Sequence, residues 1–428
     1  MVATFMVTLI AAFMAKESVL MASSAASVDS NNVVNVVTNP ISSTLTSSTL
    51  TKLFANESLT QNDSVLVTEV LNSGDQAGLF DWQAGKPLIP ASTAKLATSY
   101  FAIQKWGLRK QFETVFFKDG NTLWVKGIGD PYIVSEELDL IAEKLHQFDV
   151  SRIDKIAIDD LYFAKEPVPG RSSVRDPYNA PLSAVSANFN TVKVGMASNA
   201  QKSILESAEP QTPLTPTAKR VAGAAGVPKG KPERINLIEP RNASRHFAEL
   251  LSIKLGLHDL DIVTGRPVPA DAKMIYVHKN TRNLADIVRG MLEYSNNFMA
   301  NQLFLMFSNG SRASFSNAAK VVETYYKNEL GWQDFSLVEG AGLSRKNRLT
   351  ARQISDLLIR LGDSKELLKS YPVKEGQVWA KTGTLSGVRS FAGFISKQGR
   401  NYQFVFNFNR PVSYRYREAL MQRLVASL

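Results

Sequence analysis

The sequence contains no cysteine among its 428 residues. This absence excludes a thiol nucleophile, disulfide bonds and cysteine-ligated metal sites, and it is compatible with an exported bacterial protein. The net charge is +10, but the basic residues are spread along the chain and form no nucleic-acid-binding signature. The positive charge therefore favours anionic wall polymers or membrane surfaces as partners over nucleic acid.

Histidine is scarce as well. The four histidines all fall in or beside the middle of the chain, at His146, His246, His258 and His278. The sequence has neither a Gly-x-Ser-x-Gly elbow nor a His-Glu-x-x-His pair. A Ser-His-Asp triad and a zinc protease are therefore disfavoured, and we interpret the histidines as structural or exposed. We expect no metal and no cofactor.

Long apolar runs are missing except at the start, where Met1 to Met14 is nearly all apolar and is followed by the small residues 23–26. An apolar core followed by small residues predicts a signal peptide over 1–26, although no Lys or Arg precedes the run. At about 14 residues the run is short for a membrane span. We therefore expect an exported protein with at most peripheral membrane association.

The chain divides into regular and irregular parts. Residues 27–52 are rich in Ser, Thr, Asn and Val and predict a flexible lead-in, while 53–107 and 276–428 carry regular periodic patterns. The middle, 108–275, differs in character, and its segment 199–234 holds five prolines and predicts an irregular loop. Five segments predict one antiparallel sheet: 64–71, 78–82, 377–384, 388–396 and 402–407. Helices are predicted at 92–106, 138–148, 242–255, 284–294, 297–307, 318–330, 350–361 and 414–428.

Ser92 and Lys95 form the single Ser-x-x-Lys of the chain, at the start of a predicted helix. Residues at i and i+3 face the same way, so the Lys95 amine can approach the Ser92 hydroxyl and activate it as a base if it is at least partly neutral. Desolvation or a nearby cation such as Lys381 lowers a lysine pKa in that direction. The N–H of Ser92, at a helix start, is a candidate for half of an oxyanion hole.

Two further motifs fit the same chemistry. In 295–297, Ser295 is suited to pass a proton to a leaving amine, and Asn297 to orient Lys95 and a substrate amide. Lys381-Thr382-Gly383 lies on a predicted strand, where Lys381 and Thr382 offer a positive charge and a hydroxyl to a terminal carboxylate. Gly383 admits a substrate backbone, and the N–H of Thr384 is a candidate for the other half of the oxyanion hole. Each motif alone also fits an ordinary helix cap or edge strand.

Together, the motifs resemble a known family. Residues 90–96, 294–297 and 380–387 resemble the three motifs of penicillin-binding proteins, and the spacing of roughly 200 residues between the first two resembles the class C low-molecular-mass group. These are D-Ala-D-Ala carboxypeptidases/endopeptidases (peptidase family S13) with a large insertion between those motifs. Segments 127–131, 178–184 and 340–345 resemble further landmarks of the family, and the likeness extends over about 54–428.

The resemblance implies an α+β (α/β) fold like that of β-lactamases and penicillin-binding proteins, with a five-stranded antiparallel sheet flanked by helices. The catalytic domain would comprise 53–107 and 276–428, with 108–275 inserted between the Ser-x-x-Lys and Ser-x-Asn motifs. It implies an acyl-enzyme on Ser92, peptidoglycan stem peptides as substrates, β-lactam antibiotics as covalent inhibitors, no metal and a periplasmic location in a Gram-negative-type envelope. It also suggests that Arg345 shapes the substrate cleft and that Asp176 binds the free amine of a diamino acid.

Two positions depart from the family pattern: Ala341 stands where serine is usual, and 199–234 is short, basic and proline-rich where the family has ordered strands. Two alternatives remain open at this point. A β-lactamase or related serine esterase would share the three motifs, and a non-catalytic wall-binding protein would share the fold. The decisive prediction is spatial: Lys95, Ser295 and Lys381 should converge on the Ser92 hydroxyl.

Overall fold

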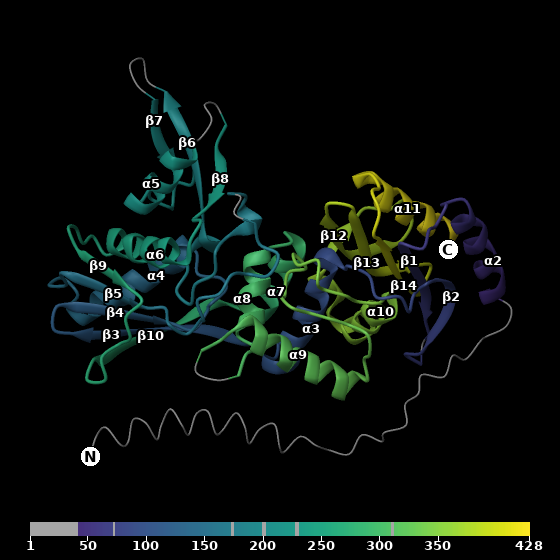
Figure 1. Cartoon of the computed structure of the whole chain (residues 1–428), viewed down its shortest axis with the longest axis horizontal. Helices are drawn as coiled ribbons and strands as arrows, with labels where there is room; N and C mark the ends of the chain where they lie inside the picture. Colours follow the sequence, from purple (N-terminus) through teal and green to yellow (C-terminus); the bar gives the residue numbers. More distant parts are fainter. Residues whose placement is uncertain (1–41, 72, 173–174, 199–202, 227–230, 310–311) are drawn as a thin grey trace.

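The computed structural model describes residues 42–428 except 72, 173–174, 199–202, 227–230 and 310–311 (Figure 1). The predicted signal peptide, 1–26, lies outside the described residues. Part of the predicted lead-in, 27–52, lies inside them and is helical, since α2 spans Ser42–Ala55. The prediction of a flexible segment is wrong there because Leu50 and Phe54, one turn apart, are buried against the large sheet.

The large sheet has six strands in the order β11-β12-β13-β14-β1-β2, all paired antiparallel. The five strands predicted from the sequence are adjacent in it, and the three-residue β11 adds a sixth at one edge. The prediction therefore missed only a strand too short to show a period. The strands are β1 (Asp63–Val70), β2 (Gln76–Trp82), β11 (Lys369–Tyr371), β12 (Gln377–Leu385), β13 (Val388–Lys397) and β14 (Arg400–Phe408).

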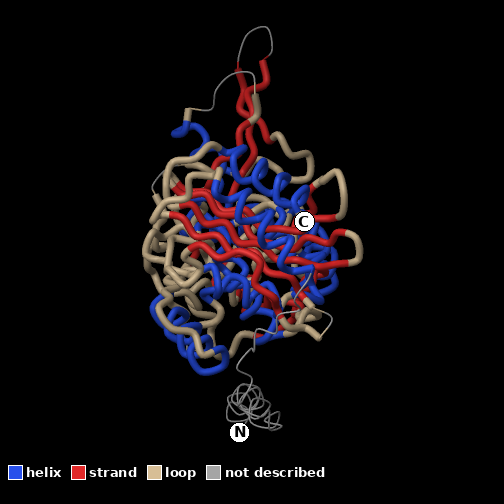
Figure 2. Tube along the Cα trace, turned by 90° about the vertical axis from the view of Figure 1, so that its right-hand side faces the viewer, coloured by secondary structure: helices blue, strands red, loops and turns tan. Residues whose placement is uncertain are grey.

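Helices cover both faces of this sheet, and Figure 2 shows helices crossing in front of the strands. Along β1, Val65 and Val67 pack into the core shared with α2 and α11 (Tyr414–Ser427), whereas Leu66 packs into the core on the opposite face. This alternation follows from the two-residue period of a strand. On the opposite face α10 (Ala351–Arg360) lies against β1, β13 and β14. Four further helices share the same core: α3 (Lys95–Trp106), α7 (Leu284–Glu293), α8 (Asn297–Leu305) and α9 (Phe315–Leu330).

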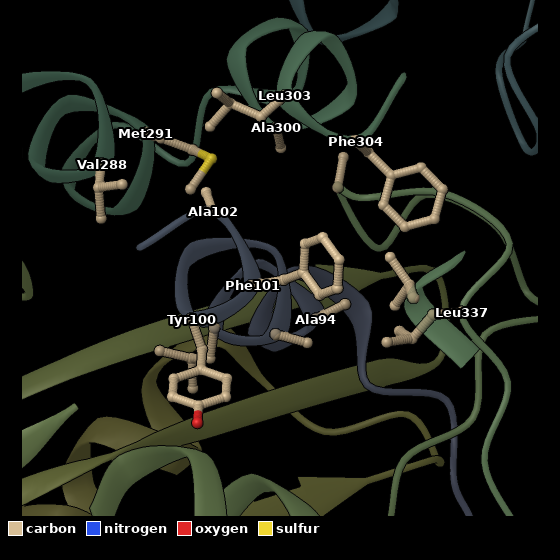
Figure 3. Close-up of a cluster of buried hydrophobic side chains, with 14 of the residues drawn as sticks. Ala94, Tyr100, Phe101, Ala102, Val288, Met291, Ala300, Leu303, Phe304 and Leu337 are labelled. Carbon is tan, nitrogen blue, oxygen red and sulfur yellow. The ribbon is translucent and has the colours of Figure 1, made fainter. Parts of the chain in front are cut away.

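Helix α3 lies at the centre of this larger core. Its Phe101 side chain lies near Phe304 of α8 and its Ala102 near Met291 of α7, whereas Tyr100 points to the other side of the helix (Figure 3) and stacks on Tyr326 of α9. The helix is buried on all sides over its first two turns, Lys95 to Ala102, and it stops at Gly107, which has a φ of 72°. The segment that follows Ser92 is therefore held rigidly inside the domain.

The inserted lobe is built on a five-stranded mixed sheet in the order β10-β3-β4-β5-β9, packed against α4 and α6. The chain enters the lobe through β3 and leaves through β10, which are antiparallel neighbours. The predicted boundary at 276 falls inside β10, because this strand stays paired with β3 as far as Asn283. The elements are β3 (Gln111–Asp119), β4 (Thr122–Gly127), α4 (Ser135–Leu145), β5 (Lys155–Asp159), α6 (Pro240–Lys254), β9 (Asp261–Thr264) and β10 (Lys273–Asn283).

A second, three-stranded sheet in the order β7-β6-β8 projects from the lobe with α5 beside it (Figure 1). It consists of β6 (Thr191–Ser198), β7 (Ser203–Ser207), α5 (Pro216–Ala225) and β8 (Glu233–Asn236). The prediction of an irregular loop over 199–234 is therefore wrong for most of its described residues. One of the prolines that suggested a loop, Pro216, occupies the first turn of α5 behind the N-cap Thr215, a position where proline favours a helix.

Within the described part of the chain, none of the helices has both the length and the apolar character that a membrane crossing requires.

Candidate active site

Ser92 lies in a 3-10 turn, Ala91–Ala94, that leads directly into α3. The turn is tightly held: the Thr93 hydroxyl donates to the Pro90 carbonyl at 2.7 Å, and Ala91 adopts a left-handed φ of 48°. A non-glycine residue in this region is strained and persists only where its surroundings fix it. The strained residue immediately precedes Ser92, which is partly exposed while Ala91 and Thr93 are buried.

Lys95 joins three parts of the chain. Its Nζ lies 3.2 Å from Ser92 Oγ, 2.7 Å from Asn297 Oδ1 and 2.8 Å from the Ala341 carbonyl oxygen. The predicted meeting of Ser92, Lys95 and Asn297 is therefore present in the fold. The carbonyl of Ala341 supplies a main-chain acceptor, so the alanine that departs from the family's usual serine still contacts the lysine through its backbone.

Lys95 is fully buried, and burial lowers the pKa of its amine to about 7, against a weaker opposing effect of the Glu339 carboxylate. Near neutral pH a substantial share of the amine is therefore unprotonated. An unprotonated amine 3.2 Å from a hydroxyl has the distance and the basicity to accept its proton.

The loop beside Lys95 is organised by Glu339, whose side chain is fully buried. Its carboxylate accepts hydrogen bonds from the backbone N–H of Ala341 at 2.8 Å and of Ser344 at 3.1 Å, and from the Asn347 side chain at 2.6 Å. These bonds fix the loop that carries the Ala341 carbonyl. Glu339 therefore acts on Lys95 both through this loop and through its negative charge.

Two glycines let the neighbouring segments approach Ser92. A Cβ on Gly342, where φ is +81°, would lie 1.8 Å from the Ala91 carbonyl oxygen, and one on Gly383 would lie 2.8 Å from the Ser92 nitrogen. Real Cβ atoms do not approach backbone atoms so closely. The Ser92 turn is therefore packed directly between the 339–344 loop and strand β12.

Lys381 is buried on β12, and its Nζ donates to the Thr382 carbonyl at 3.0 Å. Its pKa lies well below the usual range, first because of burial and then because of the positive charges of Lys95 and Arg417. Thr384, the residue after Gly383, pairs with Arg389 of β13. The Lys381-Thr382-Gly383 strand thus runs alongside Ser92, as the sequence predicts.

Ser295 adopts a left-handed φ of 54° just before α8, whose N-cap is Asn296. Among the described residues, no hydrogen bond joins the Ser295 hydroxyl to Ser92 or Lys95. A cavity of about 710 Å³ opens beside it, between residues 295–299 and the inserted lobe. Ser295 therefore lines this cavity, whereas Ser92, Lys95 and Lys381 are not among its lining residues, and the approach of Ser295 to Ser92 stays a prediction.

Most of the residues that line this cavity belong to the inserted lobe, among them Tyr178. The Asn297 side chain donates to the Tyr178 carbonyl at 3.0 Å, and the Tyr178 hydroxyl donates to Asp176 at 2.7 Å. Asp176 is thus placed one residue beyond the cavity lining, and its carboxylate already has a partner. On the other side of Ser92, Arg345 donates to the Ser386 carbonyl and so connects the 339–344 loop to the end of β12.

The histidines lie elsewhere, as predicted. His246 is fully buried beside Thr215 and its pKa falls to about 4 because of that burial, while His278 lies 2.8 Å from Glu137. His146 and His258 are exposed.

Two residues that act on the site, Glu339 and Arg417, were not predicted from the sequence. Glu339 directly precedes a Gly-Ala-Gly segment, and Arg417 precedes Leu420, Met421 and Leu424 on the apolar stripe of α11. A charged residue in line with the apolar residues of a helix indicates a buried charge, and this pattern could have identified Arg417 from the sequence.

Known D-Ala-D-Ala carboxypeptidases are similar to this chain in sequence. The model of the D-Ala-D-Ala carboxypeptidase 3 (S13) family matches residues 46–373 and 367–427. The D-alanyl-D-alanine carboxypeptidase of Actinomadura sp. (strain R39) is 25% identical over 399 residues, which cover 76% of this chain and 74% of that protein.

Solved structures share the fold as well. Penicillin-binding protein 4 from Haemophilus influenzae has a TM-score of 0.66 and 18% identity, covering 90% of this chain and 99% of its own. A predatory endopeptidase from Bdellovibrio bacteriovorus, solved with its immunity protein, has a TM-score of 0.51 and 14% identity, covering 85% of this chain and 91% of its own.

Proposed function

Because the chain belongs to the D-Ala-D-Ala carboxypeptidase 3 (S13) family and is a serine-type carboxypeptidase, we propose that Ser92 is the nucleophile that cleaves the terminal D-Ala-D-Ala bond of wall peptides. The observation that carries the assignment is the buried Lys95 amine, with a pKa of about 7, at 3.2 Å from Ser92 Oγ. A serine hydroxyl needs such a base to react at neutral pH.

In acylation, Lys95 takes the Ser92 proton while Oγ bonds to the carbonyl carbon of the penultimate D-Ala. The backbone N–H groups of Ser92 and Thr384 donate to the oxygen that becomes negative, which is the usual electrostatic stabilisation of such an intermediate. The close approach of Gly383 to the Ser92 nitrogen supports this pairing of donors. The intermediate then collapses, and the bond from carbon to the leaving nitrogen breaks.

The leaving amine needs a proton as that bond breaks. Ser295 relays the proton from Lys95 to the amine, and Asn297 holds Lys95 in place and orients the substrate amide. Lys381 and Thr382 bind the terminal carboxylate, Arg345 shapes the cleft and Asp176 binds a free amine of the wall peptide. Water then cleaves the ester at Ser92 and regenerates the hydroxyl, and no metal takes part.

We also propose that peptidoglycan stem peptides are the partners, that endopeptidase cleavage of cross-links accompanies carboxypeptidase activity, and that β-lactams acylate Ser92. The substrate lies outside the cytoplasm, so the enzyme is exported, to the periplasm. The apolar start of the sequence supports this location.

The test has two assays. In the first, the protein is labelled with a fluorescent penicillin and digested with a protease, and the labelled peptide is identified by mass spectrometry. In the second, the protein is incubated with wall peptides and the released D-Ala is measured. We expect a stable label on the peptide containing Ser92 and release of terminal D-Ala. A label elsewhere would refute the nucleophile. Rapid loss of label would indicate a β-lactamase, and no label with no product would indicate a wall-binding protein.

A charge test applies to Glu339. Its carboxylate raises the pKa of Lys95, so in Glu339→Gln we expect the midpoint of the pH dependence of acylation to move to lower pH. The maximal rate will also fall, because an amide cannot accept all three loop hydrogen bonds. The midpoint is therefore the readout, obtained from penicillin acylation rates across pH 5 to 9.

Glu143→Gln, at an exposed position on α4, is the matched control and should keep the wild-type midpoint. An unchanged or raised midpoint in Glu339→Gln would show that the carboxylate does not act on Lys95 through its charge.

A further inference from the structure

Arg417 is an arginine on the buried side of α11, with only 6% of its surface exposed. It precedes Leu420, Met421 and Leu424, which are all buried in the core beneath the large sheet. Burying a guanidinium costs free energy unless it is well hydrogen-bonded. The packing of α11 alone therefore does not explain why an arginine is buried at this position.

The contacts of Arg417 are concentrated on strand β12 beside Ser92. Its Nη1 donates to the Gly383 carbonyl at 2.6 Å and to the Thr384 hydroxyl at 2.9 Å, with a longer contact of 3.4 Å to the Ser390 carbonyl. The short partner β11 pairs with β12 only at residues 378–380, so it does not reach Gly383. On its other side this part of β12 is paired with β13, Gly383 with Ser390 and Thr384 with Arg389, so Arg417 adds a charged restraint to the segment of β12 that passes Ser92.

The Gly383 carbonyl and the Thr384 N–H belong to one peptide group. A peptide group is planar, so a donor that fixes its oxygen also fixes the direction of its N–H. We propose that Arg417 is a positioning residue that orients and polarises the Gly383–Thr384 peptide, so that the Thr384 N–H is aimed at the oxyanion. This inference rests on the proposed function, in which that N–H is one of the two oxyanion donors.

The charge of Arg417 adds to the orientation. A hydrogen bond from a cation to a carbonyl is stronger than one between neutral groups, and it draws electron density toward the oxygen, which makes the N–H of the same peptide a better donor. The hydroxyl contact to Thr384 restrains the next residue as well. Arg417 therefore acts on the transition state, in which the oxyanion exists, and not on the substrate as it first binds.

The experiment compares Arg417→Gln with wild type in two assays. One measures penicillin acylation and separates the initial non-covalent affinity from the rate of the covalent step. The other measures the affinity for a D-boroalanine peptide, whose boron bonds to Ser92 and places an oxygen in the oxyanion hole. We expect the covalent rate and the boronate affinity to fall together by about 10- to 100-fold, less than the 10²–10³ that loss of a donor costs.

The initial penicillin affinity should stay within about twofold, because ground-state contacts are kept. Arg417→Lys keeps a positive charge and a hydrogen-bond donor, so its covalent rate and boronate affinity should lie between those of Arg417→Gln and wild type. If Arg417→Gln does not fold, the same two measurements on Arg417→Lys test the proposal. Arg415→Gln, on an exposed position of the same helix, should behave as wild type.

A folded Arg417→Gln enzyme with wild-type acylation, or with weakened initial binding and unchanged boronate affinity, would overturn the proposal. Failure of the proposed function is distinct, because then wild type itself would carry no label on Ser92.

Discussion

Replacement of Lys95 with Ala is expected to slow the acylation of Ser92 by penicillin by about 10³-fold, within the 10²–10⁴ that general bases supply. The amine is the group placed to take the hydroxyl proton, at 3.2 Å, and among the described residues no histidine lies in its place. The measurement is the second-order rate of labelling, with circular dichroism to show that the variant is folded.

The wild-type rate should also depend on pH in a defined direction. The pKa of Lys95 is lowered from 10.5 to about 7, so the protonated, inactive form prevails below pH 7 and the neutral base above it. The rate of acylation should therefore rise through a midpoint near pH 7 and level off at higher pH.

Lys105→Ala is the control and should keep both the rate and the midpoint, because Lys105 is exposed and lies at the opposite end of α3 from Ser92. A folded Lys95→Ala protein that labels at close to the wild-type rate would rule out the lysine as base.

Gly342→Ala is expected to have the largest effect on stability. The added Cβ would lie 1.8 Å from the Ala91 carbonyl oxygen, and the residue would also be held at a φ of +81°. Neither backbone segment can yield easily, so we expect a loss of about 3 to 5 kcal/mol in the free energy of unfolding. Acylation should fall about 100-fold in what remains folded, since displacement of a nucleophile by about 1 Å costs that much.

Gly331→Ala separates the two causes. Gly331 ends α9 at a φ of +64°, but a Cβ there meets nothing within 4 Å, so only the backbone strain is introduced and the loss should be about 1 kcal/mol. Chemical denaturation of both variants, with penicillin labelling, is the measurement. Equal losses would show that contact with the Ser92 turn is not the reason for glycine at 342.

Much of the catalytic half could be predicted because its signals are local. Ser92 and Lys95 are one turn apart, and the alternation in β12, β13 and β14 follows the strand period, so the chain itself carries their geometry. The helix predicted from residue 350 begins there, because Thr350 is the N-cap of α10 and forms a complete capping box with Gln353. These features needed no knowledge of distant contacts.

The remaining features depend on long-range packing. Glu339 resembles an exposed loop residue in the sequence, and only the fold shows that it is fully buried and holds the loop beside Lys95. The elements of 199–234 were missed because β7 is specified by pairing with β6, which precedes that segment. Proline and small residues gave the stronger local signal there, and tertiary pairing overrode it.

The residues around Ser92 are far apart in the sequence. Lys95 is hydrogen-bonded to Asn297, 202 residues away, and to Ala341, 246 residues away. Ser390 is hydrogen-bonded to Pro90, 300 residues away. Contacts between residues so far apart in the sequence are expected to form late in folding, because closing the long loop between them costs conformational entropy before the contact stabilises the chain. A partly folded chain would therefore be unable to react with penicillin even with α3 in place. During refolding, covalent labelling by penicillin would therefore appear only when the whole catalytic domain has folded. The rate at which labelling appears would measure the rate of the last folding step.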